Sequence, residues 1–117
     1  MADNAKVYAM RFGKVWPLLV NKALRKGRSE DEVYEVASWL TGYSRAQIDE
    51  LAAGDACYAE FFNNAPAMNP KRELITGSVC GVRVQDIEEP LMRQIRQLDK
   101  LVDELAKGKP LEKILRS

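Results

Sequence analysis

The chain of 117 residues contains no histidine, and this absence excludes more chemistry than any motif that is present. Without imidazole there is no Ser-His-Asp or Cys-His activation of a nucleophile, no HExxH zinc site and no Glu-x-x-His di-iron pattern. The phosphate-binding sequences GxGxxG and GxxxxGK[ST] are missing as well. We therefore predict no cofactor, no catalytic residue and no metal ligand set, and a non-enzymatic protein is favoured over an enzyme.

Cysteine and long apolar runs are also scarce. Cys57 and Cys80 are the two cysteines of the chain. In a reducing compartment, two lone thiols are better interpreted as small buried apolar residues than as a disulfide. No apolar run approaches the roughly 18 residues that a membrane span needs, and residues 1–4 do not begin a signal peptide. We expect a cytoplasmic protein that makes no contact with a membrane.

The residues that are present describe an ordinary globular protein. Hydrophobic residues make up 46% of the chain and charged residues 30%, with 5 prolines and 7 glycines. A chain of this length buries roughly two-thirds of the surface that it exposes when unfolded. We therefore predict one domain with one core over residues 1–117.

The net charge of +1 hides an uneven distribution of charge along the chain. Residues 1–28 hold seven basic residues and one acidic residue, whereas residues 29–69 hold one basic and eight acidic residues. Residues 70–117 hold ten basic and eight acidic residues. Two interpretations are open: the basic and acidic segments neutralise each other inside the fold, or they form surfaces that attract charged partners.

Apolar residues recur at spacings of three and four along most of the chain, which is typical of amphipathic helices. The first such helix is predicted over Val15–Lys26, because Pro17 suits the first turn of a helix and Gly13 does not favour a helix interior. Two capping boxes, at Ser29 and Ser44, begin the next two helices. The further helical segments are Cys57–Phe62 after a cap at Asp55, Pro70–Cys80, Leu91–Lys107 and Leu111–Leu115, with a short helix or turn at Val84–Glu89.

These segments predict an all-α fold of five to six helices, arranged as helix hairpins around the long C-terminal amphipathic helix, without a sheet. Residues 1–12 form an N-terminal arm, helical or extended. Residues 63–70, which contain three Asn and two Pro, form the central loop. The stretch Ser78–Val84 is open to a second interpretation, because its valines also suit a short β segment.

The stretch Glu35–Leu51 resembles the helix, turn and helix of DNA-binding repressors. Ala37 precedes the turn residue Gly42 by five positions, however, where the standard motif has four, and the second helix carries Asp49 and Glu50. These acids would repel phosphates. We therefore interpret the stretch as a structural hairpin.

The long C-terminal helix carries a heptad seam, in which Leu91, Ile95, Leu98, Val102 and Leu105 step by four, three, four and three residues. Such a seam can be the spine of the domain's own core, or it can pair with a second copy to form a homodimer. Both interpretations are kept, so self-association is one of our predictions.

Four strings of residues connect the chain to a known family. They are Trp39–Tyr43 (WLTGY), Ala65–Pro70 (APAMNP), Cys80–Val84 (CGVRV) and Leu98–Lys109 (LDKLVDELAKGK). With these strings the chain resembles the domain of unknown function 2200 family over about Val7 to Leu115. The resemblance implies a small bacterial protein with no assigned activity, so it carries over no catalytic or binding residue.

Two groups of residues are candidates for contact with other molecules. Polar residues in loops and turns are candidates for a pocket or an interaction site, because loops carry function more often than core positions. These are Tyr43, Tyr58, Asn63, Asn64, Asn69, Arg72 and Arg83. If the first helix extends towards the N-terminus, four basic residues face one side and could contact phosphates: Arg11, Lys14, Lys22 and Arg25.

The sequence thus favours a protein-interaction or structural module, with an unidentified protein partner or a second copy of the chain. Binding of nucleic acid through the basic face of the first helix is the first alternative. A small-molecule or enzymatic site near the central loop is the second. Acidic pairs such as Asp49-Glu50 and Glu88-Glu89 are interpreted as solvated charges and not as ligands of a cation.

Overall fold

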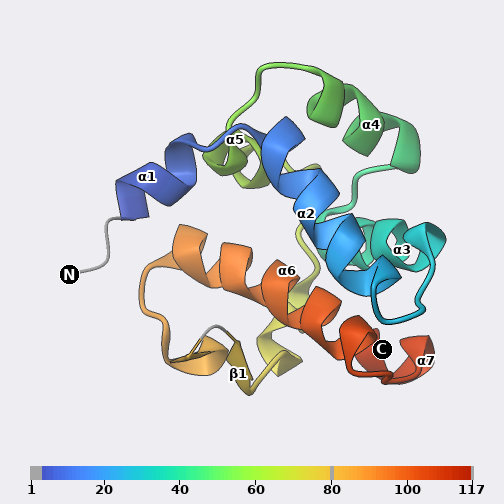
Figure 1. The fold of residues 1–117 in the computed structure, drawn as a ribbon. Coiled ribbons are helices and arrows are strands. Elements are labelled where there is room, and N and C mark those ends of the chain that lie inside the picture. Colours follow the sequence, from blue (N-terminus) through green and yellow to red (C-terminus); the bar gives the residue numbers. More distant parts are fainter. Residues whose placement is uncertain (1–3, 80, 117) are drawn as a thin grey trace.

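The fold is built around one long helix near the C-terminus, α6 (Figure 1). The structure is a computed structural model that describes residues 4–79 and 81–116. The described elements are α1 (Asn4–Ala9), α2 (Phe12–Leu24), α3 (Glu30–Thr41), α4 (Arg45–Ala53), α5 (Tyr58–Asn63), the 3₁₀ helix η1 (Pro70–Leu74), β1 (Ser78–Val79), β2 (Val82–Arg83), the 3₁₀ helix η2 (Val84–Asp86), α6 (Pro90–Ala106) and α7 (Leu111–Ile114). Helices α2, α3, α5 and α7 all contact α6. The all-α prediction is confirmed, although the described residues form seven α-helices where five to six were predicted.

Both predicted capping boxes are present. The Ser29 and Ser44 side chains accept the backbone N–H groups of Glu32 and Gln47, and those side chains bond back to the serine N–H groups. Between the two helices, Gly42 adopts a left-handed φ of 82°. A Cβ atom at this glycine would lie 2.9 Å from the Ala67 Cβ, so both backbone strain and close packing require glycine.

The start of α2 corrects the prediction for the first helix. The helix begins at Phe12 instead of Val15, so that Gly13 lies in its first turn and Pro17 lies inside it. A Cβ at Gly13 would lie 2.3 Å from the Ala52 carbonyl oxygen of α4. Gly13 is therefore tolerated because it lets α2 approach α4, a tertiary requirement that outweighs its weak helix propensity.

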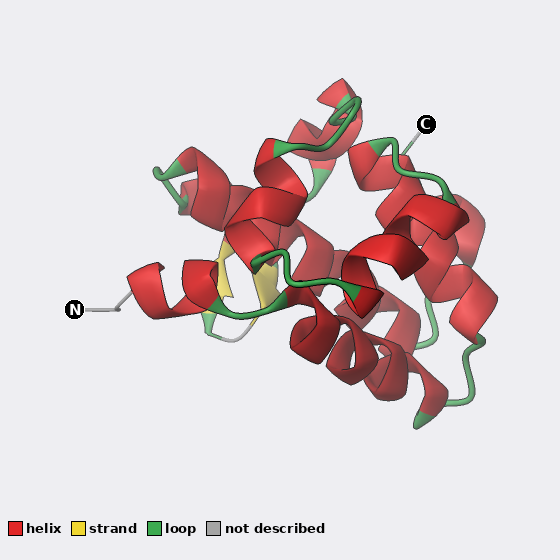
Figure 2. Ribbon diagram, turned by 90° about the horizontal axis from the view of Figure 1, so that it is seen from above, coloured by secondary structure: helices red, strands yellow, loops and turns green. Residues whose placement is uncertain are grey.

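The segment that follows the central loop also differs from the prediction. The helix predicted over Pro70–Cys80 is wrong, since only the short η1 forms, and the expectation of no sheet is wrong as well. Gly77 adopts a φ of 106°, which no helix allows, and Val79 pairs with Val82 in a two-stranded antiparallel sheet. The alternative of a short β segment in Ser78–Val84 is thereby confirmed, and Figure 2 shows these two strands in an otherwise helical molecule. Cys80 lies outside the described residues.

Helix α5 has a different cap from the predicted one. Cys57 occupies the N-cap position, and its backbone N–H donates to the Glu60 carboxylate at 3.0 Å. The Asp55 carboxylate does not cap the helix but pairs with Arg11 at 3.6 Å. The sequence favoured Asp55 because Asp is a common N-cap residue and Cys is a rare one.

The predicted N-terminal arm is partly helical. Residues 4–9 form α1, and the chain after it runs beside the segment that precedes α5. The Tyr58 N–H donates to the Met10 carbonyl at 2.7 Å, and the Phe12 N–H donates to the Ala56 carbonyl at 2.9 Å. These two bonds fix the start of α2 against α5. Residues 1–3 lie outside the described residues.

The heptad seam of α6 is buried by the chain itself. Ile95, Leu98, Val102 and Leu105 are buried, and Leu91 packs against the same core. Aromatic rings fill the space beside the seam, where Phe12 stacks on Phe61 with 4.1 Å between ring centroids. The seam is therefore the spine of the domain's own core, which is one of the two interpretations that the sequence left open.

Candidate protein interaction surface

Helix α2 has more large apolar residues than the core can cover. Val15, Trp16 and Leu19 are buried, whereas Leu18 is 63% exposed and Leu24 is 47% exposed. At 100° per residue, the solvent side of the helix forms one connected face, which we call the α2 outer face. It consists of Lys14, Pro17, Leu18, Asn21, Leu24 and Arg25, all of them exposed. Two leucines therefore lie among polar and basic residues, with about half or more of each side chain left exposed by this chain.

A groove borders this face where α2 meets α3. It encloses about 250 Å³. We call it the α2–α3 groove, and its lining residues are Trp16, Pro17, Val20, Asn21 and Leu24 of α2 with Glu30 and Tyr34 of α3. Its floor is apolar and its α3 rim carries a carboxylate, so it offers an anchor point for an apolar group.

The α3 wall of the groove is held in place by several contacts. The Tyr34 ring meets Trp16 edge to face with 5.0 Å between centroids, and its hydroxyl donates to the Asp49 carboxylate. The Arg45 guanidinium lies 4.1 Å from the centroid of the same ring and also pairs with Glu30. Burial and the bond to Asp49 raise the pKa of Tyr34, so the hydroxyl remains a neutral donor. The wall is therefore preorganised.

The basic residues around α2 fall into two groups. Arg11 pairs with Asp55 at 3.6 Å and Lys22 with Asp103 at 3.4 Å. Lys14 and Arg25 make no ion pair with any described residue. Of the four residues predicted to form a basic face, the two without an ion pair are thus the two at the ends of the α2 outer face. The neutralisation of the basic segment by the acidic one is incomplete.

A second cavity, of about 380 Å³, lies beside the turn between α3 and α4 and near the end of α5. Its lining residues are Tyr43, Gln47, Glu50, Leu51 and Asn64. Tyr43 and Asn64 belong to the predicted pocket residues, whereas Gln47, Glu50 and Leu51 were not predicted to line a pocket. The Tyr43 hydroxyl donates to the Phe61 carbonyl at 2.8 Å, so this side chain also has a structural role.

The other predicted pocket residues do not join this cavity. The Tyr58 side chain is buried in the core, and Asn63 is exposed at the end of α5. The Asn69 side chain caps η1, and Arg72 donates to the Asn69 carbonyl at 3.0 Å. Arg83 pairs with Asp86 on the surface at 3.4 Å. The seven residues therefore do not form a single site.

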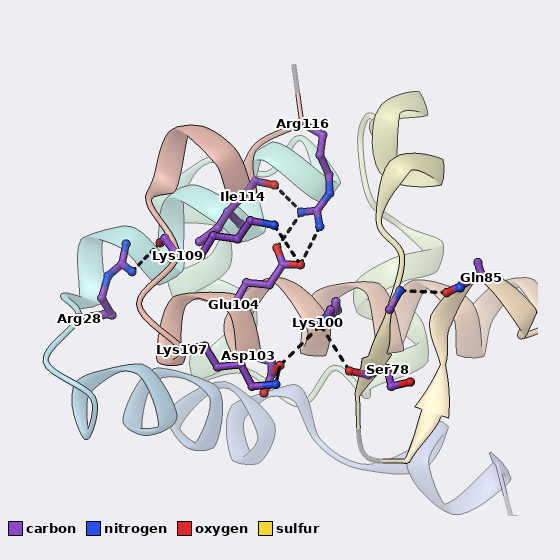
Figure 3. Close-up of polar contacts among 11 residues, drawn as sticks. Arg28, Ser78, Gln85, Lys100, Asp103, Glu104, Lys107, Lys109, Ile114 and Arg116 are labelled. Carbon is purple, nitrogen blue, oxygen red and sulfur yellow. Dashed lines mark hydrogen bonds and ion pairs between the residues drawn. The ribbon is translucent and has the colours of Figure 1, made fainter.

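A different arrangement of charge surrounds the C-terminal half of α6 (Figure 3). Glu104, whose side chain is only 7% exposed, accepts two hydrogen bonds from Arg116, at 2.9 and 2.7 Å. Lys22, Lys100 and Lys107 surround the Asp103 carboxylate. Burial alone would raise the pKa of Asp103, but Lys107 and Lys22 lower it overall. These charges are satisfied within the chain.

Arg28 extends this arrangement to the start of α3. Its guanidinium donates to the Glu32 carboxylate at 2.6 Å and to the Lys109 carbonyl at 2.7 Å. The bond from Arg28 lowers the pKa of Glu32 to about 2. We call these ion pairs the α6 charged cluster. Its carboxylates are Glu32, Asp103 and Glu104, and its cations are Lys22, Arg28, Lys100, Lys107, Lys109 and Arg116. It closes the turn between α6 and α7 and has a structural role.

Two further observations concern the described residues. They contain no group of three or more His, Cys, Asp or Glu side chains placed to hold a metal ion. None of the helices described is both long enough and apolar enough to cross a membrane.

The fold and the exposed helix face define a small all-α protein with an uncovered apolar surface. Residues 6–116 match a family described as uncharacterised proteins conserved in bacteria, the domain of unknown function 2200 family, and the chain belongs to it. The crystal structure of uncharacterised protein SP1917 is 45% identical, with a TM-score of 0.91, over 98% of this chain and 93% of that chain. No curated protein matches the chain. The resemblance drawn from the sequence is confirmed.

Proposed function

We propose that the protein is a non-enzymatic interaction module that binds a protein partner through the α2 outer face and the α2–α3 groove. The observation that carries this proposal is the exposure of Leu18 and Leu24 between basic side chains that have no ion pair with any described residue. A partner would remove this apolar surface from water and approach the free charges. The preorganised groove wall supports the proposal, because a rigid surface loses little entropy on binding.

The size of the groove favours a side chain over a free small molecule. Pockets for drug-sized molecules enclose roughly 300–1,000 Å³. The α2–α3 groove, at about 250 Å³, falls below that range. It suits one large apolar side chain of a protein partner, with the outer face of α2 supplying the rest of the contact.

Nucleic acid is a less suitable partner for the same surface. Arg11 and Lys22 are already paired with carboxylates, which lowers the positive charge offered to phosphates. Leu18 lies between Lys14 and Arg25, at the centre of the basic face. A phosphate backbone gains nothing from an apolar side chain at this position, whereas a protein surface does.

A small-molecule site is the second candidate function, and the cavity beside Tyr43 favours it. Its volume of about 380 Å³ lies within the usual range for ligand pockets. Metabolite screening by ligand-observed NMR tests this candidate. Binding that Asn64→Ala weakens would support the cavity as the site, and binding that this change leaves intact would place the ligand elsewhere.

Self-association remains a separate proposal. The seam that motivated it is buried by the chain's own helices, so a homodimer would have to use another surface. Light scattering at several concentrations tests it. A mass that rises to twice that of the chain supports self-association, and a constant monomer mass contradicts it.

The experiment for the main proposal is affinity capture from a native bacterial host, followed by mass spectrometry. The wild-type chain is compared with the double variant Leu18→Ser and Leu24→Ser. We expect a discrete set of proteins that the wild type captures and the double variant does not. A variant with the matched changes Leu74→Ser and Val82→Ser removes exposed apolar residues elsewhere and should retain those proteins. Identical captures by the wild type and the α2 variant would overturn the proposal.

A further inference from the structure

We infer that the partner presents an acidic amphipathic helix to the α2 outer face. This inference rests on the proposed function and adds the chemistry of the partner. One apolar side chain of the partner helix fills the α2–α3 groove, and its neighbours at helical spacing cover Leu18 and Leu24. Carboxylates on the flanks of the partner helix pair with Lys14 and Arg25.

The charge of α2 selects an acidic partner. Residues 12–28, which are α2 and the turn after it, contain five basic residues and no acidic residue. Lys22 and Arg28 are paired with Asp103 and Glu32, so three of the five cations have no ion pair with any described residue. Lys14 and Arg25 flank the exposed leucines and have no ion pair with any described residue. An acidic segment is attracted to this surface before contact and is held in register after it, whereas a basic segment is repelled.

The geometry selects a helix. A groove between two helices accepts the ridge of a third helix, and anchors then recur at i, i+3, i+4 and i+7. From Lys14 to Arg25 the outer face runs for roughly 17 Å at 1.5 Å per residue, which is about three helical turns. A peptide that binds by strand addition would need an open strand edge, and the two described strands lie against α6 and not beside this groove.

The same charges disfavour a symmetric pair of copies on this face. A two-fold axis would bring α2 of one copy against α2 of the other. The Lys14 and Arg25 side chains of each copy, which have no ion pair with any described residue, would then approach those of its counterpart. Like charges in contact weaken such a pair, so the surface suits a different chain.

The test uses the full chain and synthetic peptides of 15 residues that are labelled with a fluorophore. The probe peptide carries leucines at i, i+3, i+4 and i+7 and glutamates on the flanks. One control peptide replaces every glutamate by lysine, and a second has the same composition with the leucines scattered around the helix. A 15-base-pair DNA duplex is the fourth probe. Fluorescence anisotropy at low salt gives the affinity of each.

We expect the acidic amphipathic peptide to bind at least about tenfold more tightly than the lysine peptide and the scattered peptide. The charge reversals Lys14→Glu with Arg25→Glu should weaken it by about tenfold. Leu18→Ser with Leu24→Ser should weaken it by a similar factor. The matched variant Lys71→Glu with Lys113→Glu changes the net charge equally at exposed positions away from α2 and should leave binding within about twofold.

Several outcomes would overturn the inference: equal binding of the lysine or scattered peptide, preference for the duplex, or no binding of the acidic peptide. All α2 changes are at exposed positions, and a urea midpoint equal to that of the wild type verifies that each variant folds. If affinity capture depends on Leu18 and Leu24 but the acidic peptide does not bind, the proposed function stands and the acidic helix is wrong. If neither result appears, both are wrong.

Discussion

The α6 charged cluster and the α2 outer face lie on neighbouring helices and differ in how their charged side chains are paired. In the cluster, Glu104 and Asp103 are surrounded by cations of the same chain, and Arg28 bonds both to Glu32 and to a backbone carbonyl. On α2, Lys14 and Arg25 have no such partners among the described residues and stand beside exposed leucines. Charge that the chain satisfies internally stabilises the fold. Charge that it leaves free beside apolar surface is available to another molecule.

The largest effect on stability is expected from Glu104→Ala. This change removes the two hydrogen bonds that the largely buried Arg116 donates to Glu104 and leaves the one to the Ile114 carbonyl. Removal of one member of a buried ion pair costs several kcal/mol. Because Arg116 keeps its hydrogen bond to the Ile114 carbonyl, we expect a loss of about 2 kcal/mol in the free energy of unfolding. Urea denaturation followed by circular dichroism measures it.

The exposed Glu112 of α7 provides the control for this change. Glu112→Ala should alter the free energy of unfolding by less than about 0.5 kcal/mol. If Glu104→Ala has as small an effect as Glu112→Ala, the α6 charged cluster does not stabilise the fold.

A smaller effect on the free energy of unfolding is expected when the pH is lowered, because the ion pair of Arg28 and Glu32 is then lost. Folding lowers the pKa of Glu32 from its ordinary 4.5 to about 2. Its stabilising contribution is therefore complete above about pH 4.5 and is lost as the pH falls towards 2. Because the carboxylate is partly exposed, we expect this contribution to be about 1 kcal/mol.

The variant Glu32→Gln isolates this contribution from the other acids. The difference in free energy of unfolding between wild type and variant should shrink as the pH is lowered from 5 towards 2. Urea titrations at a series of pH values measure the difference. A difference that stays constant over this range would contradict the role given to the Arg28–Glu32 pair.

The smallest effect on stability is expected on α2. Leu18→Ser with Leu24→Ser removes two leucines that already face water, so the free energy of unfolding should change by less than about 0.5 kcal/mol. Val20→Ser, two positions after Leu18 on the buried side, is the matched control and should cost at least about 1.5 kcal/mol. Thermal and urea denaturation measure both. A large loss in the double variant would mean that Leu18 and Leu24 belong to the core.

The parts of the fold that the sequence predicted depend on short-range chemistry. The capping boxes at Ser29 and Ser44 require only a hydroxyl and a residue three positions on, and both are present. The turn at Gly42 and the seam of α6 follow from a left-handed backbone and a heptad spacing. Each of these signals lies within one helix or one turn, and the structure contains all of them.

The parts that were missed depend on distant contacts. Gly13 enters α2 because α4 lies against it, and Gly77 turns the chain away from a helix so that Val79 packs in the core. Leu18 and Leu24 recur with the other apolar residues of α2 at spacings of three and four, and this pattern does not show which of them the fold leaves exposed. A signal was present, since apolar residues surround α2 on more sides than one core can cover.

The central claim is that the α2 outer face meets a partner protein in the cell. Site-specific photo-crosslinking tests it most directly, with benzoylphenylalanine incorporated in place of Leu18 or, as a control, in place of Glu112. The account predicts a discrete protein adduct from position 18, absent from position 112 and lost when Lys14→Glu and Arg25→Glu are added. An adduct of equal yield from both positions, or none from position 18, would contradict it.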